Sequence, residues 1–141
     1  MTKLLKTLLC CAALMSVQSA FSQVAVVVGA KSSISSLNAE QVSALYLGKT
    51  DKLPSGDTAL PLDQAAGSTV RGSFYEKVTG KSEAQVKSAW SRLVFSGKGT
   101  PPKEVASSAD VKKLVSTNPN TIGYIEKSAV DSSVKVVFSV D

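Results

Sequence analysis

Hydrophobic and polar positions follow two different periods along the chain, one typical of strands and the other typical of helices. An unbroken run of valine and alanine, closed by Gly29, forms the first element at residues 24–29. Such a run predicts a strand buried on both faces, as in the parallel sheets of α/β proteins. Shorter apolar runs predict three more strands, at residues 59–62, 121–125 and 134–138.

Apolar residues spaced three and four positions apart predict four helices between these strands. Asn38 and Gln41 form a capping-box pattern that begins the first helix, and Gly48 is a suitable residue to end it. Further helices are expected at residues 67–80, from residue 82 to the loop at 97–102, and at residues 107–118. Trp90 shares the apolar stripe of the third helix, so it is expected in the core. The pattern predicts one α/β domain, a small mixed sheet flanked by helices, over residues 23–141.

The first 22 residues have the three regions of a secretory signal peptide. Lys3 and Lys6 form a positive start, residues 8–15 are apolar, and Ala20 and Ser22 are the small residues of a cleavage site. Cleavage is expected after Ser22, which predicts a periplasmic or secreted protein that is not inserted in the membrane afterwards. Both cysteines of the chain lie in the apolar region, so the mature protein is expected to lack cysteine.

Composition excludes several classes of function. The chain has 141 residues with 16 Lys+Arg and 11 Asp+Glu; removing Lys3 and Lys6 leaves 14 − 11 = +3. The basic residues are dispersed, which argues against a nucleic-acid partner. The chain has no histidine, and the expected mature chain has no cysteine, so triads and ordinary zinc sites are excluded. We expect no enzyme activity, no cofactor and no metal.

One segment has the features of an anion site. Residues 63–69 connect a strand end to a helix start, where free backbone N–H groups and the helix dipole favour negative charge. Ser68 and Thr69 add two hydroxyl groups. The alternative at this point is that Ser68 only caps the helix.

Five blocks of sequence resemble the phosphate ABC transporter substrate-binding protein family. They are residues 36–42, 46–49 (Tyr-Leu-Gly-Lys), 63–69, 97–99 and 121–126 (Thr-Ile-Gly-Tyr-Ile-Glu), and they occur in the order of that family. The resemblance implies the fold of a type 2 periplasmic binding protein. Typical members have two lobes with phosphate between them, and this chain resembles a short member with a single lobe.

The resemblance is incomplete at the family's phosphate turn, which reads Arg-Ser-Asp-Gly-Ser-Gly-Thr. Gly67 and Ser68 match it, but Gln64 stands in place of the arginine and Ala66 in place of the aspartate. We therefore expect weak oxyanion binding with poor preference for phosphate over sulfate, because Ala66 cannot accept the proton of hydrogen phosphate. The ligand-binding residues implied by resemblance are Gln64, Gly67, Ser68 and Thr69, with Arg71 as a further candidate whose direction the sequence does not fix.

The resemblance implies a periplasmic solute-binding-like protein for phosphate or another small oxyanion, serving an ABC uptake system with a permease as partner. The alternative is a single-lobe interaction or envelope-signalling module that has lost tight ligand binding. Such a module would pair with a second copy of itself or with another protein.

Overall fold

The computed structural model describes residues 23–141, and the expected signal peptide at residues 1–22 lies outside them. Within this range the chain forms a five-stranded mixed sheet in the order β3-β2-β4-β1-β5. The strands are β1 (Val24–Gly29), β2 (Leu60–Gln64), β3 (Lys103–Val105), β4 (Thr121–Glu126) and β5 (Val134–Val140). The expected mixed sheet is confirmed, and the short β3, which follows a loop rich in glycine and proline, was not expected.

Strand β1 lies inside the sheet, and all six of its residues are buried, as the run of valines predicts. The suggested parallel pairing is wrong, because β1 runs antiparallel to both of its neighbours, β4 and β5. Parallel pairing occurs instead around β2, which is parallel to β3 and to β4. Burial on both faces comes here from the helices that cover the sheet.

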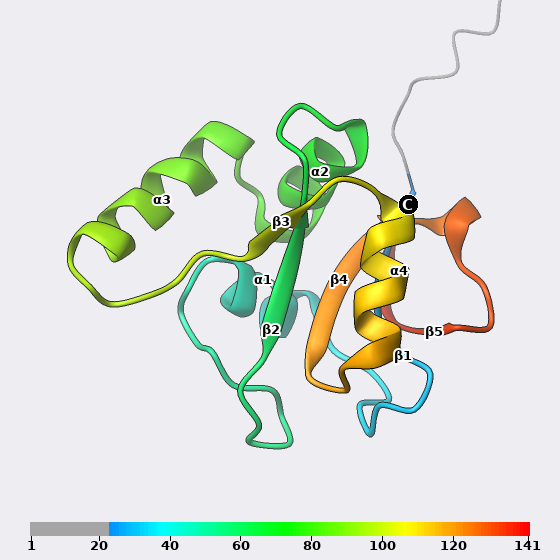
Figure 1. Cartoon of the computed structure of the whole chain (residues 1–141). Helices are drawn as coiled ribbons and strands as arrows, with labels where there is room; N and C mark the ends of the chain where they lie inside the picture. Colours follow the sequence, from blue (N-terminus) through cyan, green and yellow to red (C-terminus); the bar gives the residue numbers. More distant parts are fainter. Residues whose placement is uncertain (1–22) are drawn as a thin grey trace, which may run out of the picture.

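Helices cover both faces of the sheet (Figure 1). One face packs against α1 (Ala39–Tyr46), α2 (Thr69–Phe74) and the π-helical η1 (Tyr75–Thr79), and the other packs against α4 (Ser108–Thr117). A short 3-10 helix, η2 (Lys127–Ala129), precedes β5. Alternate residues of β1 contribute to the two cores, with Val26 on the α1 face and Val27 on the α4 face.

The predicted helix starts are confirmed in detail. Asn38 and Ser82 each form a complete capping box, with Gln41 and Gln85 respectively at the third helical position. Ser107 caps α4 by accepting a hydrogen bond from the Asp110 amide. These contacts are local in sequence, and they satisfy backbone N–H groups that have no partner inside the helix.

Helix α3 (Glu83–Phe95) is less well packed than its apolar stripe predicts. Figure 1 shows it standing to one side of the sheet, and Val86 is its only buried residue. The expectation that Trp90 lies in the core is therefore corrected: its ring is half-buried and packs against the rim of the core. Its indole N–H donates to the Tyr46 carbonyl over 2.8 Å, which fixes the ring where α3 meets the end of α1. Within residues 23–141 none of the helices has the length and apolar character needed to cross a bilayer.

Candidate functional site

The turn after β2 is shaped by one glycine and one serine. Gly67 has a φ of +83°, a conformation that residues with a Cβ adopt only at a cost. The Ser68 amide donates to the Ala65 carbonyl over 3.1 Å, which closes the turn. The Ser68 hydroxyl then accepts a hydrogen bond from the Arg71 amide at 3.3 Å and caps α2. The capping role that the sequence left as an alternative is thus present.

The turn still presents free donors. Helix α2 continues directly into η1, so the helical run covers residues 69–79. Among the described residues, the amides of Gly67, Thr69 and Val70 make no hydrogen bond. An anion can accept hydrogen bonds from such free amides at the start of a helical run. Gly67 and Thr69 are exposed to solvent, and Ser68 is half-buried.

Gln64 has a different environment from the other expected ligand residues. Its side chain is buried, and the amide nitrogen donates to the Tyr124 carbonyl at 2.9 Å and to the Ser108 hydroxyl at 3.0 Å. The Gln64 side chain is therefore engaged in joining β2 to β4 and α4. It does not take the place of the family's arginine at the turn.

Arg71 points back toward the turn. Its Nη1 donates to the Gln64 carbonyl at 2.8 Å, from the third residue of α2. The side chain is only 14% exposed and faces three carboxylates: Asp63 at 3.7 Å, Glu83 at 3.3 Å and Glu104 at 3.4 Å. The structure thus places a guanidinium beside position 64, from a different residue than the family pattern uses.

The charge balance around Arg71 is negative, with three carboxylates around one guanidinium. Burial by itself would lower the pKa of Arg71, but Asp63, followed by the nearby tyrosines and Glu83, outweighs burial and raises it. Arg71 Nε faces Glu83 but forms no hydrogen bond with any described residue. No group of three or more acidic side chains within residues 23–141 is arranged to hold a metal ion.

Asp63 is the centre of a buried polar network that the sequence did not reveal. Its carboxylate accepts hydrogen bonds from the Tyr75 hydroxyl at 2.5 Å and from the Tyr124 hydroxyl. It also accepts one from the backbone N–H of Gln64 at 3.0 Å. Burial, then the Asp63 charge and its hydrogen bond, raise the pKa of both tyrosines far above the ordinary value. The only feature of the sequence that points to this network is a charged residue, Asp63, directly after the apolar residues 59–62. The network holds Asp63 in place beneath Arg71.

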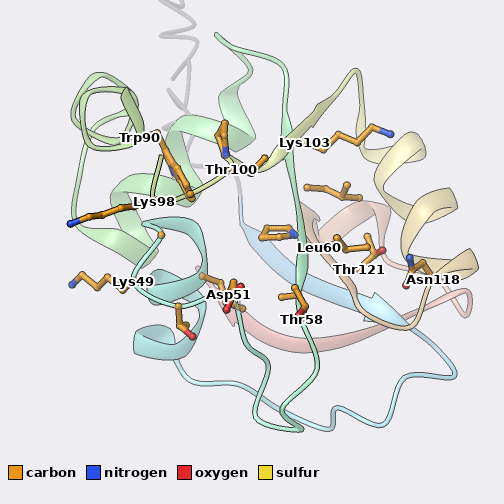
Figure 2. A pocket seen from close by; sticks show the side chains of 18 of the residues that line it. Lys49, Asp51, Thr58, Leu60, Trp90, Lys98, Thr100, Lys103, Asn118 and Thr121 are labelled. Atoms are coloured by element: carbon orange, nitrogen blue, oxygen red, sulfur yellow. The ribbon is translucent and has the colours of Figure 1, made fainter. Parts of the chain in front are cut away.

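Two cavities lie near β2. The smaller, of about 470 Å³, is lined by Asp63, Arg71, Tyr75 and Glu104 together with residues of α3 and Pro101 and Pro102. The larger, of about 1020 Å³, lies over the first half of β2, and none of the expected ligand residues lines it. Figure 2 shows this larger cavity, with the ammonium groups of Lys49 and Lys98 pointing outward from it. Of the expected ligand residues only Arg71 lines the smaller cavity, and Gln64, Gly67, Ser68 and Thr69 do not.

Several solved structures have a fold similar to that of residues 23–141. A protein of Clostridium perfringens, described as a phosphate ABC transporter substrate-binding protein and solved with bound phosphate, superposes with a TM-score of 0.66 at 24% identity. An ABC-type phosphate transport receptor of Vibrio cholerae superposes at 0.63 with 23% identity, and PstS of Borrelia burgdorferi at 0.60 with 13% identity. The fold is that of one periplasmic-binding-protein lobe.

The chain spans about half the length of each of these three proteins. The lobe aligns over 82–83% of this chain but covers only 45%, 46% and 47% of those three structures respectively. No protein-family model and no curated sequence matches the chain. The expected lobe architecture is thus confirmed as a fold, and what the lobe binds is a matter for proposal.

Proposed function

We propose that this protein binds phosphate or a related small oxyanion as a periplasmic solute-binding-like protein. The observation that carries the proposal is the position of Arg71, whose guanidinium reaches the Gln64 carbonyl at the end of β2. It lies there beside a turn with free amides, in a fold shared with a protein solved with bound phosphate. Backbone amides and arginine side chains are donors that commonly bind oxyanions.

The arrangement favours weak binding. An oxyanion at the turn would accept from the amides of Gly67 and Thr69, from the Ser68 hydroxyl and from Arg71. The guanidinium is already engaged by Asp63, Glu83 and Glu104, so the incoming anion must compete with them and is repelled by those that remain. The exposed turn adds little exclusion of water, which weakens charged hydrogen bonds further.

Export and transport belong to the same proposal. Residues 1–22 have the pattern of a signal peptide, and we propose that cleavage after Ser22 releases the lobe into the periplasm. The similar solved proteins include an ABC transporter substrate-binding protein and an ABC-type transport receptor, which supports a role in an ABC uptake system with a permease as partner.

Calorimetric titration with phosphate tests the proposed ligand. We expect saturable binding by the wild type and at least about tenfold weaker binding by Arg71→Lys, because lysine keeps the charge but loses the two-pronged contact. Arg92→Lys on the exposed surface of α3 is the matched control and should leave the affinity unchanged. Absence of binding, or equal affinities for the two variants, would contradict the proposal. Circular dichroism checks that each variant is folded.

One observation favours the second candidate, an interaction module. Phe95 is 97% exposed and Val94 is 51% exposed at the end of α3, where a soluble surface would normally carry polar residues. A second copy of the chain, or another protein, could cover them. Light scattering of the purified protein separates the two functions. The interaction module would be favoured if the wild type is an oligomer that does not bind phosphate and Phe95→Ser converts it to a monomer.

A further inference from the structure

The larger cavity exists because the first half of β2 has a strand partner on one side only. On that side β4 pairs with Leu60 and Pro61, whereas on the other side the pairing with β3 begins at Leu62. The segment before β3 contains Pro101 and Pro102, which have no N–H to donate to a neighbouring strand. The sheet edge is therefore uncovered there, and the cavity of about 1020 Å³ lies over it (Figure 2).

This open edge is poorly suited to pairing with a strand from another protein. The Leu60 amide donates to the Asn120 carbonyl at 2.9 Å, the Ala59 amide donates to the Asp51 carbonyl at 2.8 Å, and Pro61 has no N–H. Strand addition relies on main-chain hydrogen bonds, and these three residues have no amide left to give. The volume of the cavity is instead close to the upper end of the range for small-molecule sites, about 300–1,000 Å³.

The cavity offers two apolar surfaces to a small molecule. One is the half-buried indole ring of Trp90, whose N–H is already satisfied by the Tyr46 carbonyl at 2.8 Å. Two loops pack closely on this ring through glycines, since a Cβ at Gly48 would lie 2.9 Å from the ring and one at Gly99 would lie 3.1 Å from it. The other surface is the side chain of Leu60, which is 48% exposed.

Positive charge is added to the cavity by the same two loops. Lys49 and Lys98 are each adjacent to one of the two glycines, and Lys103 contributes a third ammonium group from β3. Asp51 is the only carboxylate among the lining residues. Within residues 23–141 none of the three lysines has an ion-pair partner. The ammonium groups of Lys49 and Lys98 point outward (Figure 2), so the positive charge lies outside the apolar surfaces.

We propose that the larger cavity binds an amphipathic organic anion, a carboxylate or sulfonate with an aromatic body. The aromatic part packs against Trp90 and Leu60, and the anionic group lies outside, where Lys49 and Lys98 supply unpaired charge. Lysine acts as a flexible point charge, so it selects for charge more than for shape. The inference goes beyond the proposed oxyanion function and is independent of it, because none of residues 63–71 lines this cavity.

The test is a fluorescence titration with 8-anilinonaphthalene-1-sulfonate, observed through Trp90, the only tryptophan of the chain. We expect saturable quenching by this probe and about tenfold weaker binding of N-phenyl-1-naphthylamine, which has the same rings without the sulfonate. Combining Lys49→Ala with Lys98→Ala should weaken binding of the sulfonate about tenfold and leave the neutral probe unchanged.

Two controls locate the probe. Combining Lys31→Ala with Lys81→Ala removes the same charge from exposed positions outside the cavity and should leave the affinity unchanged. Phe95→Ser, at the exposed end of α3, should also leave it unchanged. The proposal would be overturned if the wild type shows no saturable quenching, or if either control weakens binding as much as the loss of Lys49 and Lys98 does. Such a loss would show attraction by net charge alone or binding at α3.

Discussion

Replacing Asp63 by asparagine would remove the charge at the centre of the tyrosine network without removing the side chain. The carboxylate accepts from Tyr75 at 2.5 Å and from Tyr124, and it faces Arg71 Nη2 at 3.7 Å. Hydrogen bonds to a charged group contribute about 1.5–3 kcal/mol, and neutral ones about 0.5–1.5 kcal/mol. Converting two charged bonds to neutral ones should therefore lower the free energy of unfolding by about 2–3 kcal/mol.

Urea unfolding measures this loss through the fluorescence of Trp90, the only tryptophan of the chain. A double-mutant cycle with Tyr75→Phe isolates the contact, and the double variant should lose about 1 kcal/mol less than the sum of the single variants. Asp57→Asn in an exposed loop is the matched control and should change stability by less than about 0.5 kcal/mol. A loss for Asp63→Asn no larger than that of the control, with an additive cycle, would refute the reasoning.

Three other predictions concern the tyrosines, the turn and α3. Tyr46, Tyr75 and Tyr124 are the only tyrosines of the chain, and their pKa values are all raised above the ordinary 10.0. Their contribution to stability is therefore fully present below pH 10 and is lost as the pH rises above it. Tyrosinate absorbance should consequently appear only together with unfolding. Ionisation of the tyrosines in the native protein near pH 10 would contradict this prediction. Gly67→Ala should lower the free energy of unfolding by roughly 1–2 kcal/mol because of the positive φ, as urea unfolding can measure; unchanged stability would argue against that backbone conformation. Acrylamide should quench Trp90 fluorescence partially, since the ring is half-buried, and complete protection would place it in the core instead.

Local contacts explain why so much of the fold was predictable. The capping boxes at Asn38 and Ser82 depend on residues three positions apart, so the sequence displays them directly. The orientation of β1 and the existence of β3 depend on partners far away in the chain, and the pattern of valines does not encode them. The apolar stripe of α3 likewise predicts which side of the helix faces inward. Whether the sheet covers that side depends on residues far away in the chain, so the stripe does not show it.

The candidate site was predictable as a place but not as a set of contacts. The strand end followed by Gly67 and Ser68 locates the turn from local sequence. The return of Arg71 depends on the geometry of the helix, and the approach of Glu104 depends on the register between β2 and β3. Gln64 was expected to face a ligand, yet the alternation of side chains along β2 turns it toward Ser108.

The most direct test of the oxyanion site is a phosphate titration of the protein followed by amide nuclear magnetic resonance. If the account is right, saturable shifts will be concentrated at the amides of Gly67, Thr69 and Val70 and at the Nε–H of Arg71, because these donors at the turn have no hydrogen-bond partner within residues 23–141. Shifts that are absent, or confined to residues around the larger cavity such as Lys49 and Lys98, would contradict the account.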